Sequence, residues 1–438
     1  MWHALRSPQR SGAAALAGLL LLVGVVITLH VHAYTTFSPI DELHHADYMI
    51  KAAHGQLLRR GDVMGPETRR EGACRGVDAT GVGPFSCDDE TWLAGREFNT
   101  EEIQPPAYYV ITGWTARALR PLLGTASLVT AGRMVGVLWL GAGILAVWAA
   151  LSILDVPVLG RLAVGALLAT TPVVLHASAT ITDDATAVLA GAAVLLAALA
   201  WEARRAPAFV VVLAAAVGVS FRLTNFAGAG VVVLYLVIRA LRPRAEPAAA
   251  ASPPPRALLL MAGAVVATVA VTGVAWVGLN SAMARVGPLA NPNTFNQQAC
   301  CLPFDSILGQ VDATVTPAHD PYLVSFLQNN KVRVVVKLTD WLLLGTAVGL
   351  AALSARGSRG EALAAAAIVG MLATGPLLTV TNYVFQGAFY GIPPRYGLSM
   401  MPALAACVAL SLDKDWVRAC VVSLASVSVL MTLVLELR

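Results

Sequence analysis

Long apolar runs recur along nearly the whole chain, and they leave few folds open to it. We count about eleven runs of roughly 20 residues, the length that crosses a bilayer core as a helix. They fall at 11–33, 131–153, 158–180, 185–202, 207–223, 226–241, 256–279, 334–354, 361–382, 396–412 and 416–436. The chain is 57% hydrophobic and only 13% charged, whereas soluble domains contain about 25% charged residues. The sequence predicts an all-α polytopic membrane protein.

The first apolar run has some features of a signal peptide. Arg6 and Arg10 precede it, and Val31-His32-Ala33 resembles a cleavage site. Its apolar core is longer than the ~7 to 15 residues typical of a cleaved signal. We therefore expect an uncleaved transmembrane helix.

The basic residues of the short loops predict the orientation. They fall on one side of the membrane if the N-terminus is cytoplasmic, because cytoplasmic loops carry excess Lys and Arg. The residues are Arg6, Arg10, Arg161, Arg204, Arg205, those between Arg239 and Arg256, Arg356, Arg359, Lys414 and Arg418. The exterior parts are then 34–130, the turns near 183 and 222–225, 280–333, 383–395 and the C-terminus. We expect a multi-pass protein of the cell membrane.

A Pro- and Ala-rich stretch at 242–256 reads as a stiff cytoplasmic linker. It divides an N-terminal transmembrane module, 1–241, from a C-terminal one, 257–438. The first module carries the long exterior loop 34–130, and the second carries the exterior loop 280–333. Nothing in the chain indicates nucleic-acid binding.

Two of the six cysteines, Cys74 and Cys87, lie in the first exterior loop. An oxidising exterior permits disulfides, so we predict a bond between them. The cysteine spacing does not fit a zinc ribbon.

Acids and imidazoles crowd into residues 41–48, directly after the first apolar run. If 41–54 is helical, then Asp41, His44, His45 and Tyr48 share one face. That face would hold a reacting hydroxyl or a divalent ion. Alternatively, Asp41 and its neighbour Glu42 simply cap the helix and favour its dipole.

A second notable segment begins with Gln104 and two prolines and continues through Tyr108, Tyr109 and Trp114. It is amphipathic, and Tyr and Trp are typical of membrane interfaces. We expect it to lie on the membrane surface.

Four charged residues mark other exterior turns. Asp183 and Asp184 follow one span, and they either take part in a site or merely mark a helix end. Arg222 and Arg395 either bind phosphate oxygens, for which the planar guanidinium is suited, or reach lipid headgroups.

Together these motifs resemble the GT-C class of membrane glycosyltransferases. The resemblance is carried by Asp41, Glu42, His45 and Tyr48, the Gln104–Tyr109 segment, Arg133, Thr171-Pro172 leading to Asp183-Asp184, and Arg395-Tyr396 with Pro402. Within that class the chain is most similar to the bacterial branch related to protein O-mannosyltransferases and aminoarabinose or arabinofuranosyl transferases. The implied fold is a GT-C-like bundle of about eleven spans, with juxtamembrane helices in the first exterior loop.

The resemblance implies an inverting enzyme of the cell envelope. It would move a sugar from a polyprenyl-phosphate donor to a hydroxyl of a glycan, lipid or protein acceptor. Asp41 maps to the catalytic acid of the first exterior loop, and we expect it to act as the base. Asp183 or Asp184 maps to the second acidic site, and Arg395 to the donor phosphate site. We assign Arg222 and Tyr396 to the phosphate site too, and Glu42, His44, His45 and Tyr48 to substrate orientation.

Metal dependence and chemistry stay open in part. The side chains of Asp41, His44, His45 and Asp183 have oxygen and nitrogen atoms that suit Mn²⁺ or Zn²⁺. The family contains both metal-dependent and metal-independent members, and we expect no obligatory metal.

The competing class is a non-enzymatic transporter or flippase of lipid-linked sugars. Such a protein would place its charges near the bilayer midplane rather than at exterior helix ends.

Overall fold

All regular structure in the described part of the protein is helical. The computed structural model describes residues 8–78, 84–89, 98–242, 253–286, 301, 304–320, 330–387 and 389–437, and these ranges contain no strand. Most of the predicted linker 242–256 and much of the loop 280–333 lie outside the described residues. The all-α prediction is confirmed.

Eight helical stretches are long and apolar enough to cross a membrane. They belong to α1 (Pro8–Ala33), α5 (Leu128–Ile153), α8 (Ala187–Glu202), α10 (Phe226–Leu241), α11 (Pro255–Met283), α15 (Asn330–Leu353), α16 (Arg359–Gln386) and α18 (Asp415–Glu436). The stretches that contain α8 and α10 also include the short turn before each helix. A ninth would come from α6 (Val158–Thr170) and α7 (Pro172–Ala179), which meet at an angle of 63°. These helices fit a polytopic membrane protein.

Two of the expected spans contain only short helices. The helix α9 (Phe209–Phe221) has 13 residues and α17 (Met401–Leu410) has 10. At 1.5 Å per residue, both fall well short of the ~30 Å hydrocarbon core. The count of about eleven spans therefore stays a prediction.

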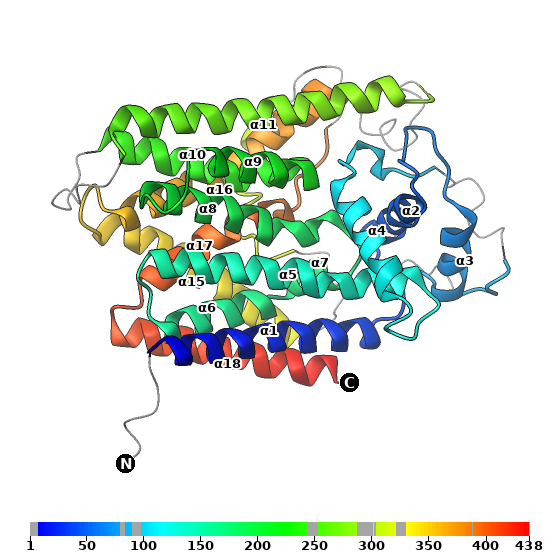
Figure 1. Cartoon of the computed structure of the whole chain (residues 1–438), viewed down its shortest axis with the longest axis horizontal. Helices are drawn as coiled ribbons and strands as arrows, with labels where there is room; N and C mark the ends of the chain where they lie inside the picture. Colours follow the sequence, from blue (N-terminus) through cyan, green and yellow to red (C-terminus); the bar gives the residue numbers. More distant parts are fainter. Residues whose placement is uncertain are drawn as a thin grey trace, which may run out of the picture.

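The long helices lie side by side, and the first loop covers one end of their bundle (Figure 1). This cap contains α2 (Glu42–Ala53), α3 (Pro66–Arg75), the short turn η1 (Glu101–Ile103) and α4 (Ala107–Leu119). The C-terminal ends of α1 and α18 point to the same end (Figure 1). The cap therefore lies where the chain enters and leaves the first predicted exterior loop.

One large hydrophobic core runs through the bundle and includes residues from both predicted modules, such as Leu199 and Leu404. A second core joins the cap to the bundle through Tyr48, Tyr109 and Trp139. Together they fix the cap over the helix ends.

Glycines let the site-bearing turns approach the bundle closely. A Cβ at Gly136 would collide with the backbone oxygen of Ser178, and one at Gly191 with that of Ser399. These contacts bring the end of α7 onto α5, and the turn η5 (Pro394–Met400) onto α8.

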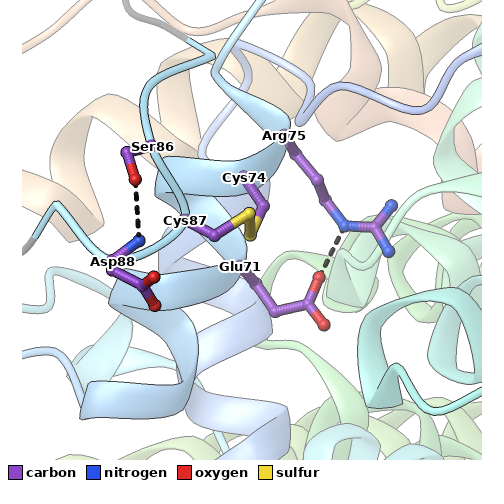
Figure 2. The surroundings of a disulfide bond; sticks show 6 residues. All are labelled: Glu71, Cys74, Arg75, Ser86, Cys87 and Asp88. Atoms are coloured by element: carbon purple, nitrogen blue, oxygen red, sulfur yellow. Dashed lines mark hydrogen bonds and ion pairs between the residues drawn. A yellow bond between two sulfur atoms is a disulfide. The ribbon is translucent and has the colours of Figure 1, made fainter.

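The predicted disulfide between Cys74 and Cys87 forms, as Figure 2 shows. It ties α3 to a segment 13 residues away. Beside it, Arg75 pairs with Glu71 at 2.6 Å. Arg75 also donates to Thr130 Oγ1 at 2.9 Å, which fastens α3 to the start of α5.

Asp47, the second aspartate of the 41–48 cluster, holds the cap together. Its buried carboxylate accepts hydrogen bonds from Lys51 Nζ (2.6 Å), Gly65 N (2.7 Å), Thr68 Oγ1 (2.9 Å) and Asn99 Nδ2 (2.8 Å). A buried charge requires hydrogen-bond partners of this kind, so we assign Asp47 a structural role.

Candidate active site

Asp183 and Asp184 occupy the turn η2 (Asp183–Thr186), where α7 leads into α8. Thr182 Oγ1 accepts from the backbone N–H of Asp184 at 3.3 Å, and Thr186 Oγ1 donates to the carbonyl of Asp183 at 2.8 Å. Both carboxylates are buried. They are inside the molecule rather than exposed markers of a helix end.

Arg222 faces these acids from the turn between α9 and α10. Its Nη1 forms ion pairs with Asp183 Oδ1, at 3.1 Å, and with Asp184 Oδ1. The side chain is 4% exposed. Arg222 therefore points into the protein and does not reach toward lipid headgroups.

Arg395 comes to the same place from η5. Its Nη1 donates to Asp320 Oδ2 at 3.0 Å, and its Nε lies 3.5 Å from Asp184 Oδ2. The ring of Tyr396 lies 4.9 Å from the guanidinium carbon of Arg222 and 5.6 Å from that of Arg395. Asp184 thus bridges two arginines that are far apart in sequence. Asp320 was not among the predicted site residues.

A hollow lies beside Arg395, with a volume of about 290 Å³ when its opening is included. Its polar lining consists of His176, Thr182, Asp184, Asp320 and Arg395. Ile40, which directly precedes Asp41, completes one wall. The hollow therefore lies between the turn acids and the start of α2.

Asp183, Asp184, Arg222, Asp320 and Arg395 form one buried charged cluster. His45 connects the cap to this cluster. Its Nδ1 hydrogen-bonds the hydroxyl of Tyr109 at 2.7 Å and lies 3.7 Å from Glu101 Oε2, while its Nε2 lies 3.5 Å from Thr182 Oγ1. His44 Nδ1, by contrast, has no hydrogen-bond partner in the part of the chain that the structure describes. Of the two adjacent imidazoles, His45 is the one that belongs to the cluster.

Burial shifts the pKa values of His45 and of its neighbour Glu101. It lowers the pKa of His45 well below its ordinary value, and the charges of Arg222 and Arg395 act in the same direction. Burial also raises the pKa of Glu101 well above its ordinary value, with Asp41 and Asp183 adding repulsion. Near neutral pH the imidazole is therefore uncharged. Glu101 was missed by sequence reasoning.

Both tyrosines of the Gln104 segment are buried, which corrects the expectation that they face the membrane interface. Tyr108 accepts from the backbone N–H of Thr182 at 3.2 Å, and Tyr109 stacks on Tyr48 with ring centres 3.9 Å apart. The helix α4 turns its other face outward, with Trp114 63% exposed. Gln104 is half-buried.

Asp41 is the exposed acid of the group. It occupies the N-cap position of α2 with φ 57°, a left-handed conformation that is costly for a residue other than glycine. Its side chain makes no capping hydrogen bond, so such a bond does not account for its position. Its charge acts on both His44 and Glu101, which places Asp41 at the rim of the cluster.

Glu42 has a structural position instead of the substrate-orienting one that we expected. Its two carboxylate oxygens accept from Arg133 Nε and Nη2, both at 2.7 Å. They also accept from the backbone N–H groups of Ser38 (2.7 Å) and Ile181 (3.0 Å). This buried pair joins the start of α2 to α5 and to the turn before Asp183.

A metal site is not assembled from the candidate ligands. Within the described ranges, no three His, Cys, Asp or Glu side chains are grouped as a metal ion would need. Asp183 is paired with Arg222, and His45 is bonded to Tyr109.

Comparison with protein-family models finds no match for this chain, and comparison with curated proteins also finds none. The case for function therefore rests on the geometry of the cluster.

Proposed function

We propose that the protein is an inverting glycosyltransferase of the GT-C class. It would transfer a sugar from a polyprenyl-phosphate donor to an acceptor hydroxyl at the exterior face of the cell membrane. One observation carries the proposal. Motifs identified independently around residues 183, 222 and 395 meet in one buried cluster, and His45 of the first loop joins them.

Arg395 is the proposed phosphate-binding residue. It borders the hollow, and its side chain is 16% exposed compared with 4% for Arg222. Three carboxylates, on Asp183, Asp184 and Asp320, form ion pairs with the two arginines. An incoming phosphate would exchange with the Asp320 contact of Arg395, and that carboxylate would then be available for a sugar hydroxyl.

Asp41 is the proposed base. A hydroxyl is a weak nucleophile, and a carboxylate within hydrogen-bond reach removes its proton as the new bond forms. Asp41 is exposed and makes no capping bond, so it is accessible to an acceptor. The glycosidic C–O bond breaks on the opposite side, and the electron pair leaves with the lipid phosphate. The arginines stabilise that charge, and direct displacement inverts the anomeric carbon.

The alternative of a transporter or flippase receives less support. It would require charged groups along a path through the bundle. The cluster instead adjoins the cap, because Nε2 of His45 in α2 lies 3.5 Å from Thr182 Oγ1. Asp340, which is buried in the span α15, accepts a hydrogen bond from Ala318 N at 3.1 Å, a structural contact.

A transfer assay tests the proposal. The purified full chain in lipid nanodiscs is incubated with a panel of polyprenyl-phosphate sugars, and release of polyprenyl phosphate is followed. We expect turnover with at least one donor and a loss of about 100-fold or more in Arg395→Gln, because a preorganised charge facing the leaving group is removed. The control is Arg418→Gln, a half-exposed arginine of α18 outside the cluster.

Equal turnover in Arg395→Gln and Arg418→Gln would contradict the assigned phosphate site. Movement of intact lipid-linked sugar between leaflets, without release of polyprenyl phosphate, would favour the flippase.

A further inference from the structure

A second hollow lies between α1, α6, α7, α15 and α18, and it is larger than the one beside Arg395. Its volume, which includes the opening to the surroundings, is about 460 Å³. Most of its wall is apolar and includes Leu175, Val332, Val335, Met431 and Leu435. A hydrocarbon chain suits such a wall.

A buried acid–imidazole pair lines this hollow. His30 Nδ1 hydrogen-bonds Glu436 Oε1 at 2.9 Å, and the two side chains are 5% and 7% exposed. The other oxygen, Glu436 Oε2, is buried and has no hydrogen-bond partner among the described residues. A buried carboxylate oxygen without a donor is costly, so this atom points to a ligand that donates a hydrogen bond.

The two hollows share one residue, His176. It lines both, and its Nε2 lies 3.1 Å from Ser38 Oγ, three residues before Asp41 in the chain. The ring centre of His176 is 6.2 Å from that of His30. A molecule held by Glu436 would therefore lie next to the proposed transfer site.

We infer that this second hollow binds a hydroxyl-bearing membrane lipid with its chain against the apolar wall and its hydroxyl on Glu436. The carboxylate can only accept, so it would repel a lipid phosphate and select a neutral donor such as an alcohol. His30 and Glu436 lie near the C-terminal ends of α1 and α18, at the same end of the bundle as the cap. The binding of this lipid is independent of the proposed transferase function. Its role as the acceptor rests on that function.

Photolabelling of the full chain in nanodiscs tests the inference without any turnover. The probe is a monoacylglycerol that carries a diazirine in its chain, and the matched control probe has both hydroxyls methylated. We expect the alcohol to label peptides of α18 and α1, and the ether to label them roughly tenfold less, because it cannot donate to Glu436. Met431→Trp, which fills the hollow, should abolish labelling. Leu430 lies on the same helix and is 64% exposed, so Leu430→Trp should leave labelling unchanged.

Each outcome decides one part of the inference. Equal labelling by the alcohol and the ether in the wild type would overturn it, and this comparison needs no variant to fold. Labelling that Met431→Trp and Leu430→Trp preserve alike would overturn it too. Specific labelling of a protein that cleaves no polyprenyl-phosphate sugar would support the lipid site and reject the transferase. Specific labelling of an active enzyme that never glycosylates the alcohol would overturn the acceptor assignment.

Discussion

At the scale of single residues, the neutral state of His45 is central to the site. The imidazole is buried between Tyr109 and Thr182 and lies near two arginines. Because it is uncharged, it can accept from or donate to a substrate hydroxyl without repelling the arginines. The same burial gives the fold a dependence on pH.

Acid should destabilise the protein through His45. The folded pKa lies well below the ordinary value of 6.5, so the unfolded chain takes up a proton first as the pH falls. This contribution to stability is complete above about pH 6.5 and decreases by ~1.4 kcal/mol per pH unit below it, until the folded pKa is reached. Glu101 acts oppositely: its raised pKa makes stability fall as pH rises above about 4.5.

Substitution isolates the His45 contribution. Thermal unfolding of His45→Gln between pH 5 and 8 should show a weaker loss of stability on acidification than the wild type. The control His54→Gln, whose side chain is half exposed, should follow the wild type. Parallel curves for all three proteins would contradict the assignment.

The 41–48 cluster shows how far residue-level prediction extends. Sequence spacing correctly predicted the helix that carries these groups. It did not distinguish the roles of neighbours, because these depend on residues far away in the chain. Glu42 pairs with Arg133, which lies 91 positions away in the sequence, and His45 hydrogen-bonds Tyr109, 64 positions away. Glu101 and Asp320 were not among the predicted site residues and entered the site only through folding.

At the scale of elements, the disulfide is the strongest constraint on the cap. Replacing both Cys74 and Cys87 with Ser should lower the free energy of unfolding by about 3 kcal/mol, the value for a loop of about 15 residues. Thermal unfolding with and without a reductant measures this. Reductant should affect the wild type and the Cys420→Ser control equally and leave the double variant unchanged. A wild type that is insensitive to reductant would contradict the constraint.

Hydropathy located the apolar helices well but not their lengths or bends. The run 158–180 reads as one span, yet Pro172 lacks the N–H that would continue α6, and the helix bends by 63° there. The turn before Asp183 is placed by this bend. The close approach of η5 to α8 depends on Gly191 packing against a distant segment, which no local pattern encodes.

At the scale of the whole molecule, the account requires the cap and the cluster to face the cell exterior. Single cysteines test this in a background that lacks the cysteines at 300, 301, 407 and 420. We expect Gln56→Cys, in the cap, to react with a membrane-impermeant maleimide in intact cells. Arg205→Cys, in the loop after α8, should react only after lysis. The reverse pattern would contradict the predicted orientation.

The central claim is that Asp41 deprotonates an acceptor at the rim of the cluster, and its substitution tests that claim most directly. Asp155 offers a matched control, because both residues are exposed and have nearly the same positive φ, 57° and 58°. In the polyprenyl-phosphate-sugar assay, Asp41→Asn should lower turnover by about 10² to 10⁴-fold with no change in unfolding temperature. Asp155→Asn should change neither quantity. Equal turnover in Asp41→Asn and Asp155→Asn would contradict the account.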